Sequence, residues 1–256
     1  MLDLLLKVAP FADICVARIA QFNQDLGGPD IGTSQQRLAQ VSTFPDSGSL
    51  DLIKLNVSSK AIKWATEVQQ ADIVSLSLGW EHEQTTEKRW VANAISRALD
   101  FRDQKLLFFA SASNYGGGTR ELFPARHPGV FSIRATDHSG THQSFNPSLP
   151  EDSSTTVYGT LGVGVSTLRR NGLQTPVVRT GTSPATAIAS GIAALIIAYI
   201  NTSNQGASWD DIKTQSGYER LLQKLSTEPE ARKQFITLEE IYHAPTALGR
   251  ILTKVT

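Results

Sequence analysis

The order of apolar and polar residues along the chain predicts four short strands. Mostly apolar runs, rich in β-branched and aromatic residues, occupy residues 13–19, 72–78, 106–110 and 129–135. A short run with little polar alternation is typical of a strand that is buried on both of its faces. Such strands belong in a parallel sheet that helices cover on both sides.

Two stretches between these strands have the period of an amphipathic helix. In residues 57–70, which Asn56 or Ser58 could cap, the apolar face consists of Ala61, Ile62, Ala65 and Val68. In residues 87–103 it consists of Trp90, Val91, Ala94, Ile95, Ala98 and Leu99. Strands that alternate with helices predict βαβ crossovers, and functional residues are then expected beyond the carboxyl ends of the strands.

The amino-acid composition changes after the fourth predicted strand. Residues 136–180 are rich in Ser, Thr, Gly, Pro and Asn, which predicts loops and short strands, one of them within residues 159–165. Residues 183–200 are the most apolar helical stretch, with Gly191 inside it. Because this helix is apolar all round, we expect it to be buried centrally.

The last part of the chain is amphipathic and charged. Its apolar positions are Trp209, Ile212, Tyr218, Leu221, Leu222 and Leu225. We therefore expect two parts, a domain of residues 1–204 and a helical C-terminal extension of residues 205–256.

Composition and charge exclude several classes of protein. With 40% hydrophobic and 19% charged residues the chain is globular rather than disordered or fibrous, and 24 basic residues balance 24 acidic ones. A net charge of zero gives no global field for nucleic acid or anionic lipid. The single cysteine, Cys15, excludes an internal disulfide and a multi-cysteine zinc site.

The apolar runs are also too short for a signal peptide or a membrane span. The first residues carry Asp3 where a signal peptide would carry a basic residue, and the run at residues 193–200 is well below the length of a span. This favours the inside of a cell, although truncation would have deleted any leader.

The sharpest candidate for chemistry is Ser183, which follows Gly181 and Thr182 at the start of the buried helix. Unpaired backbone amides and the positive end of the helix dipole favour developing negative charge at this position. Pro184 fits the first turn, where a missing N–H costs nothing. The alternative is that Ser183 is an ordinary N-cap residue.

The second candidate is Asn114, which comes directly after a buried strand and before Gly116 and Gly117. An amide there can donate to an oxyanion at the top of the sheet, while the glycines let a ligand approach the backbone closely. The alternative is an ordinary turn asparagine.

Taken together, four blocks of the chain resemble the subtilisin-like serine endopeptidase family. They are residues 72–79, which end in Ser-Leu-Gly, residues 109–114, residues 123–125 and residues 181–191. They occur in the family's order, so the resemblance covers roughly residues 8–200. It implies a three-layer, parallel-sheet α/β fold, a peptide or protein substrate and no cofactor; no motif places a calcium site.

The resemblance assigns roles to individual residues. It implies that Ser183 is the nucleophile and that Asn114 is the oxyanion donor. It also implies that the substrate cleft is lined by Ser77, Leu78, Gly79, Ser111, Ala112 and Ser113. These small, mildly apolar walls suit an extended peptide backbone.

Two departures from the family stand out. Ala187 replaces a proline in the nucleophile helix. More importantly, residues 8–19 resemble the segment that comes shortly after the family's histidine block, so the catalytic aspartate and histidine are absent and the fold lacks its N-terminal third. Residues 46–48 (Asp-Ser-Gly) and 140–142 (Gly-Thr-His) imitate the missing motifs but fall in the wrong order. We interpret Asp46 as a loop residue beside Pro45 and His142 as a solvated loop histidine.

Three functions remain open at this point. The chain is the carboxyl-side portion of a serine endopeptidase, nearly inert alone, which a missing N-terminal segment or a partner chain completes by covering an apolar sheet edge. Alternatively, it is an inactive pseudoprotease that binds peptides. In the third case the resemblance misleads, and the chain is another parallel α/β enzyme.

Overall fold

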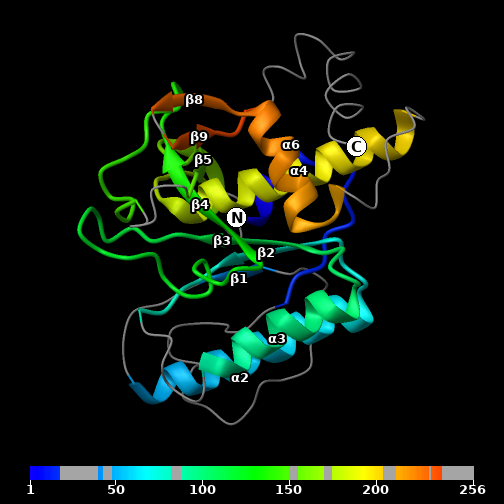
Figure 1. Cartoon of the computed structure of the whole chain (residues 1–256). Coiled ribbons are helices and arrows are strands. Elements are labelled where there is room, and N and C mark those ends of the chain that lie inside the picture. Colours follow the sequence, from blue (N-terminus) through cyan, green and yellow to red (C-terminus); the bar gives the residue numbers. More distant parts are fainter. Residues whose placement is uncertain are drawn as a thin grey trace.

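Seven strands form one sheet, in the order β1-β2-β3-β4-β5-β9-β8 (Figure 1). The computed structural model describes residues 1–17, 40–42, 48–81, 88–149, 155–169, 175–203, 212–230 and 232–237. The strands are β1 (Gln40–Ser42), β2 (Ile73–Ser77), β3 (Leu107–Ser111), β4 (Val130–Thr136), β5 (Val157–Leu161), β8 (Thr227–Glu230) and β9 (Lys233–Phe235). Neighbouring strands are parallel except β8 and β9, which are antiparallel.

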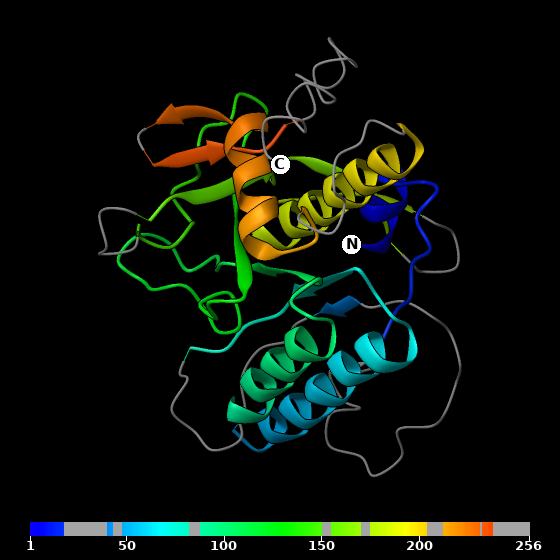
Figure 2. The same ribbon diagram turned by 45° about the vertical axis from the view of Figure 1, so that its right-hand side comes forward.

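Helices cover both faces of this sheet, as Figures 1 and 2 show from two directions. One face carries α2 (Gly48–Lys63), its π-helical continuation η2 (Trp64–Val68) and α3 (Lys88–Phe101). The other face carries α4 (Thr182–Ser203) and α6 (Gln215–Leu225), and α1 (Leu2–Val8) packs on α4. A separate antiparallel hairpin consists of β6 (Val165–Arg169) and β7 (Thr175–Arg179). The predicted parallel sheet with helices on both sides is confirmed.

Strand β3 shows why the sheet is buried on both faces. Its five residues are all buried, and they alternate between two cores. Leu107 and Phe109 pack with residues of α4 and α6, whereas Phe108 and Ala110 pack with residues of α2 and α3. Because successive side chains of a strand point to opposite faces, an unbroken apolar run satisfies both layers at once.

Helix α4 is the central helix of the second core. Its window Thr182–Tyr199 is long and apolar enough to cross a membrane by composition alone, yet 61% of that window is buried inside the domain. Gly191 lies where a Cβ would come within 2.8 Å of the Val8 Cβ, so the absence of a side chain allows α1 to approach α4 closely. The prediction of a buried central helix is confirmed by these contacts.

The structure departs from the expected pattern in the first strand and in two helical positions. Residues 13–17 form no strand and are at most half-buried, so the prediction for residues 13–19 is wrong over this part, and residues 18–19 lie outside the described residues. On the helices, Val68 is 65% and Trp90 is 42% exposed, although both continue apolar stripes.

The C-terminal segment contributes more than a helix. Helix α6 places Tyr218 edge-on against Phe109 and Phe131, with ring centroids 5.8 and 5.5 Å apart. Strand β9 pairs with β5, and β8 forms the outer edge of the sheet. The described part of the expected extension, residues 212–237, therefore packs on the same core as the rest of the chain.

Candidate active site

Ser183 lies in the first turn of α4. The helix begins at Thr182, so the position that precedes the helix is Gly181 and Ser183 does not cap it. The Ser183 side chain is half-buried, and its hydroxyl has no hydrogen-bond partner among the described residues. An unpaired hydroxyl beside the positive end of a long helix is free to meet a ligand.

Asn114 lies just beyond β3 and reaches the start of the same helix. Its Oδ1 accepts a hydrogen bond from the Thr182 N–H at 2.8 Å, across 68 positions of sequence. Asn114 therefore satisfies one of the unpaired amides of α4 from a different element. Because Oδ1 is the bound atom, Nδ2 is the free donor, and no partner for it exists within the described part of the chain.

Gly181 holds the two groups together. Its N–H donates to the Gly162 carbonyl at 2.8 Å, and its φ of +145° is one that residues with a side chain rarely adopt. A Cβ at this position would lie 3.2 Å from both Oδ1 and Nδ2 of Asn114. The backbone of Gly181 therefore contacts the Asn114 amide directly before the helix that carries Ser183.

We expect Gly181→Ala to destabilise the protein by about 1–3 kcal/mol through backbone strain, and to displace the Asn114 amide. Urea unfolding measures the first effect. Gly117→Ala is the matched control, because Gly117 has no positive φ and a Cβ there would meet nothing within 4 Å. Equal stability of the two variants would contradict the argument.

The end of β2 lies beside this helix start. The Ser77 hydroxyl is 3.5 Å from the Ser183 carbonyl oxygen, at the limit of a hydrogen bond. Leu78 and Gly79 use neither backbone N–H nor C=O in a hydrogen bond with another described residue. A Cβ on Gly79 would come within 2.6 Å of the Leu122 Cβ, so Leu122 packs directly on this segment.

The end of β3 is more tightly bound. Ser111, Ala112 and Ser113 are all buried, and the Ser113 hydroxyl accepts from the Tyr115 N–H at 3.2 Å. Ala112 donates its N–H to Ile133 at 3.0 Å and accepts from Leu122 at 2.8 Å. The structure brings the predicted cleft segments to one end of the sheet, but the side chains of 111–113 point into the protein.

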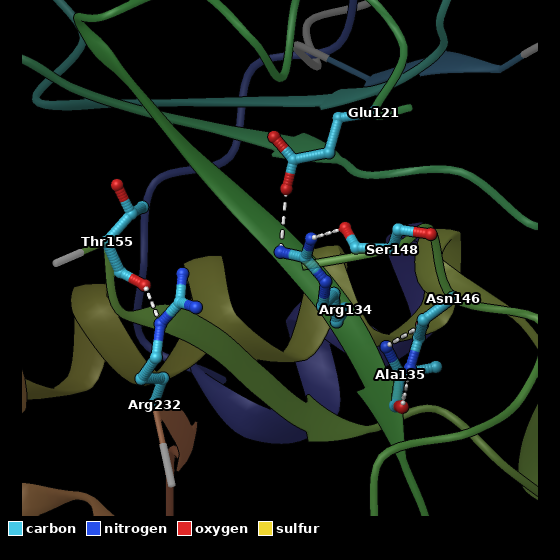
Figure 3. Close-up of polar contacts among 7 residues, drawn as sticks. All are labelled: Glu121, Arg134, Ala135, Asn146, Ser148, Thr155 and Arg232. Atoms are coloured by element: carbon cyan, nitrogen blue, oxygen red, sulfur yellow. Dashed lines mark hydrogen bonds and ion pairs between the residues drawn. The ribbon is translucent and has the colours of Figure 1, made fainter. Parts of the chain in front are cut away.

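A buried ion pair, which the sequence analysis missed, lies behind this loop (Figure 3). Arg134 of β4 is 2% exposed, and its Nη1 is 2.6 Å from Oε1 of Glu121. Its Nη2 donates to the Ser148 carbonyl at 3.1 Å. Burial lowers the pKa of Arg134, and the Glu121 carboxylate opposes that shift. The only sequence signal was an arginine inside an apolar strand.

The same region is held together by a set of backbone hydrogen bonds. Gly116 and Gly117 donate to the carbonyls of Phe145 and Ser144, at 2.9 and 3.2 Å. Gly118 donates to the Ser148 hydroxyl at 2.8 Å. Nearby, Asn146 both donates to and accepts from the backbone of Ala135 (Figure 3). The loop that follows Asn114 is thus fixed against residues 144–148.

No interaction in this structure joins Ser183 to any of the described histidines. His142 is half-buried with shielded ring nitrogens, so its interpretation as a solvated residue is wrong; its ring lies against Gly159. His127 accepts from the Gly129 N–H at 3.0 Å, just before β4 begins. His138 follows Asp137 in the next turn. Asp46, His82 and His243 lie outside the described residues.

The described residues also contain no cluster of three or more His, Cys, Asp or Glu side chains that could hold a metal ion. The site consists of a hydroxyl, a carboxamide and backbone amides. These are the groups that acyl transfer needs for a nucleophile and an oxyanion hole, and within the described segments no histidine that could act as the base contacts the nucleophile.

Comparison with known proteins gives a consistent result. A sequence profile described as Subtilase family matches residues 3–216. A mutant of the protease domain of PatA superimposes with a TM-score of 0.60 at 19% identity, covering 75% of this chain and 66% of that chain. The prenylagaramide maturation protease PagA gives 0.60 at 20% identity, with coverages of 79% and 69%.

The PatG macrocyclase in complex with peptide is also similar, with a TM-score of 0.57 at 20% identity. The alignment covers 77% of this chain and 56% of PatG, so the chain spans little more than half of that structure. These identities support the fold alone. A search of curated protein sequences found no match.

Proposed function

The chain belongs to the subtilase family of proteases, peptidase S8, and from this premise we propose that it carries the nucleophile and oxyanion half of a serine endopeptidase site. The observation that supports the proposal is the 2.8 Å hydrogen bond from Thr182 to Asn114. It fixes the Asn114 amide at the end of the helix that carries Ser183. Family membership also makes the third reading, an unrelated α/β enzyme, wrong.

In this mechanism the Ser183 hydroxyl attacks the carbonyl carbon of a peptide bond and passes its proton to a general base, which then gives that proton to the leaving amine. The carbonyl oxygen becomes an oxyanion, and the free Nδ2 of Asn114 and a backbone amide of the first turn of α4 donate to it. The positive end of the α4 dipole favours the same charge. All of these groups are held in place before a substrate binds, which is how an oxyanion hole lowers the barrier.

The backbone that follows β2 suits a peptide substrate. Leu78 and Gly79 leave their N–H and C=O groups available to pair with an extended chain, as in strand addition to a sheet edge. Their position beside Ser183 would bring the scissile bond to the hydroxyl.

We propose that the general base comes from outside this chain, from a preceding segment or a partner polypeptide that carries the family's aspartate and histidine. Without a base the Ser183 hydroxyl is a weak nucleophile. In subtilisin, loss of the histidine alone lowers kcat by about 10⁶. We therefore expect the isolated chain to be nearly inert.

Labelling with a fluorophosphonate tests this proposal. The chain is incubated alone and together with a polypeptide that carries aspartate and histidine blocks of the family, and labelled peptides are mapped by mass spectrometry. We expect labelling at Ser183 only in the mixture, and its loss in Ser183→Ala. Ser190→Ala is the control, because that buried hydroxyl bonds to Thr186 in the same helix. Labelling elsewhere, or none in the mixture, would overturn the proposal.

The second candidate is a pseudoprotease that binds peptides. It is favoured by the fact that none of the described histidines contacts Ser183. It predicts peptide binding that Ser183→Ala leaves unchanged, with no fluorophosphonate labelling in the presence of any complementing polypeptide. The two candidates therefore give opposite results in the same experiment.

A further inference from the structure

A groove lies away from Ser183, between two helices on the opposite side of the sheet. Figures 1 and 2 show α2 and α3 side by side on that face, with α4 on the other. The groove between α2–η2 and α3 has a volume of about 370 Å³.

The groove has the length and the ridge spacing that a third helix would need to pack into it. Its walls are formed by one stripe at three- and four-residue spacing from Asn56 to Glu67, and a second from Trp90 to Phe101. At a rise of about 1.5 Å per residue, each stripe is about 16 Å long, or three helical turns. Parallel ridges separated by such a furrow are the surface into which the side chains of another helix pack.

Small residues form the floor of the groove and large apolar ones stand at its ends. Thr66, Ala94 and Ala98 line the floor, and the Thr66 hydroxyl is already bonded to the Ile62 carbonyl at 2.8 Å. Trp90 is 42% and Phe101 is 54% exposed. Two exposed aromatic side chains that line one groove together with small apolar residues form an apolar patch, and such patches mark interaction surfaces.

The rim of the groove is positively charged. Lys60, Lys63 and Arg97 line it, against a single carboxylate, Glu67. Glu67 lies 3.7 Å from Lys63, while Lys60 and Arg97 have no acidic partner among the described residues. In a chain of zero net charge this excess is local, and it favours an acidic ligand.

We propose that this groove docks an acidic amphipathic helix presented by a partner polypeptide. The apolar face of that helix would fill the furrow over Ala94 and Ala98 and contact Trp90 and Phe101, and its flanking carboxylates would pair with Lys60 and Arg97. A polyanion without an apolar face would leave the furrow empty. The inference is independent of the protease site, because it uses none of the residues near Ser183.

A charge-reversal experiment tests the proposal. The probe is a fluorescein-labelled amphipathic helical peptide with a leucine face flanked by glutamates, and its partner probe carries lysines instead. We expect the protein to bind the glutamate peptide at least about tenfold more tightly, and the double variant Lys60→Glu/Arg97→Glu to reverse that preference. Arg89→Glu, on α3 but outside the groove, should leave the preference unchanged.

A third variant tests the apolar contact separately. Ala94→Gln should weaken the glutamate peptide by blocking the floor without altering charge, because Ala94 lines the groove and is only half-buried. Circular dichroism would verify that each variant is folded. Equal affinity for the two peptides would overturn the proposal. Equal displacement of the peptide by a single-stranded DNA of similar charge would also overturn it, because that result would indicate a general anion surface. Self-association of the protein through the groove, measured by sedimentation, would overturn it as well.

Discussion

Replacement of Glu121 by alanine is expected to lower the free energy of unfolding by about 3–5 kcal/mol. The variant removes the carboxylate that lies 2.6 Å from Nη1 of Arg134 and leaves a guanidinium that is 2% exposed without a counter-charge. Burial already lowers the pKa of Arg134, which means that the surroundings disfavour its charge. Urea unfolding followed by circular dichroism measures the loss.

Two further variants separate the charge from the packing. Glu67→Ala breaks an ion pair that is exposed and 3.7 Å long, so it should change stability by no more than about 1 kcal/mol. The double variant Glu121→Leu/Arg134→Met removes both charges and should recover most of the stability that Glu121→Ala loses. If Glu121→Ala and Glu67→Ala lower the free energy of unfolding equally, the Arg134–Glu121 pair does not contribute the stability assigned to it.

The parts of the fold that the sequence predicted are those with a local signature. The strands at residues 72–78, 106–110 and 129–135 are buried on both faces, so each carries an uninterrupted apolar run. The helices between them carry apolar stripes because one face packs on the sheet. In these segments the burial of each residue follows from its own position in the pattern.

The failures involve partners that lie far away in the sequence. Residues 13–17 have an apolar pattern but form no strand, because strand formation also requires a neighbour in register. Conversely, β8 and β9 have no strand pattern, and β8 contains Pro229. They form at the sheet edge, where a proline is tolerated, and the register of β8 against β9 shifts between Thr227 and Glu230.

The candidate site shows the same division. The motifs around Asn114 and Ser183 were visible because each is local, and the fold brings them to one helix end. The ion pair of Arg134 and Glu121 was missed, since nothing near an arginine in a strand indicates where its carboxylate is. The exposure of Trp90 could not be predicted either, because an apolar stripe on a helix does not show which of its residues the sheet buries.

Asn114 has two separable functions in our proposal, and two substitutions distinguish them. Its Oδ1 caps α4, and its free Nδ2 donates to the oxyanion. Asn114→Leu removes both groups, so we expect a loss of about 1 kcal/mol of stability and a fall in kcat of about 10²–10³. The rates are measured on a peptide substrate in the complemented assembly, and the stabilities by urea unfolding.

Asn114→Asp isolates the donor. A carboxylate still accepts from the Thr182 N–H and is favoured by the helix dipole, so the stability of this variant should stay within about 0.5 kcal/mol of the wild type. It cannot donate to an oxyanion and repels its charge, so kcat should fall at least as far as in Asn114→Leu. Asn93→Asp, on the exposed side of α3, controls for the added charge. A wild-type rate in Asn114→Asp would mean that Asn114 only caps the helix, because a residue that stabilises the transition state cannot lose its single donor without slowing the reaction.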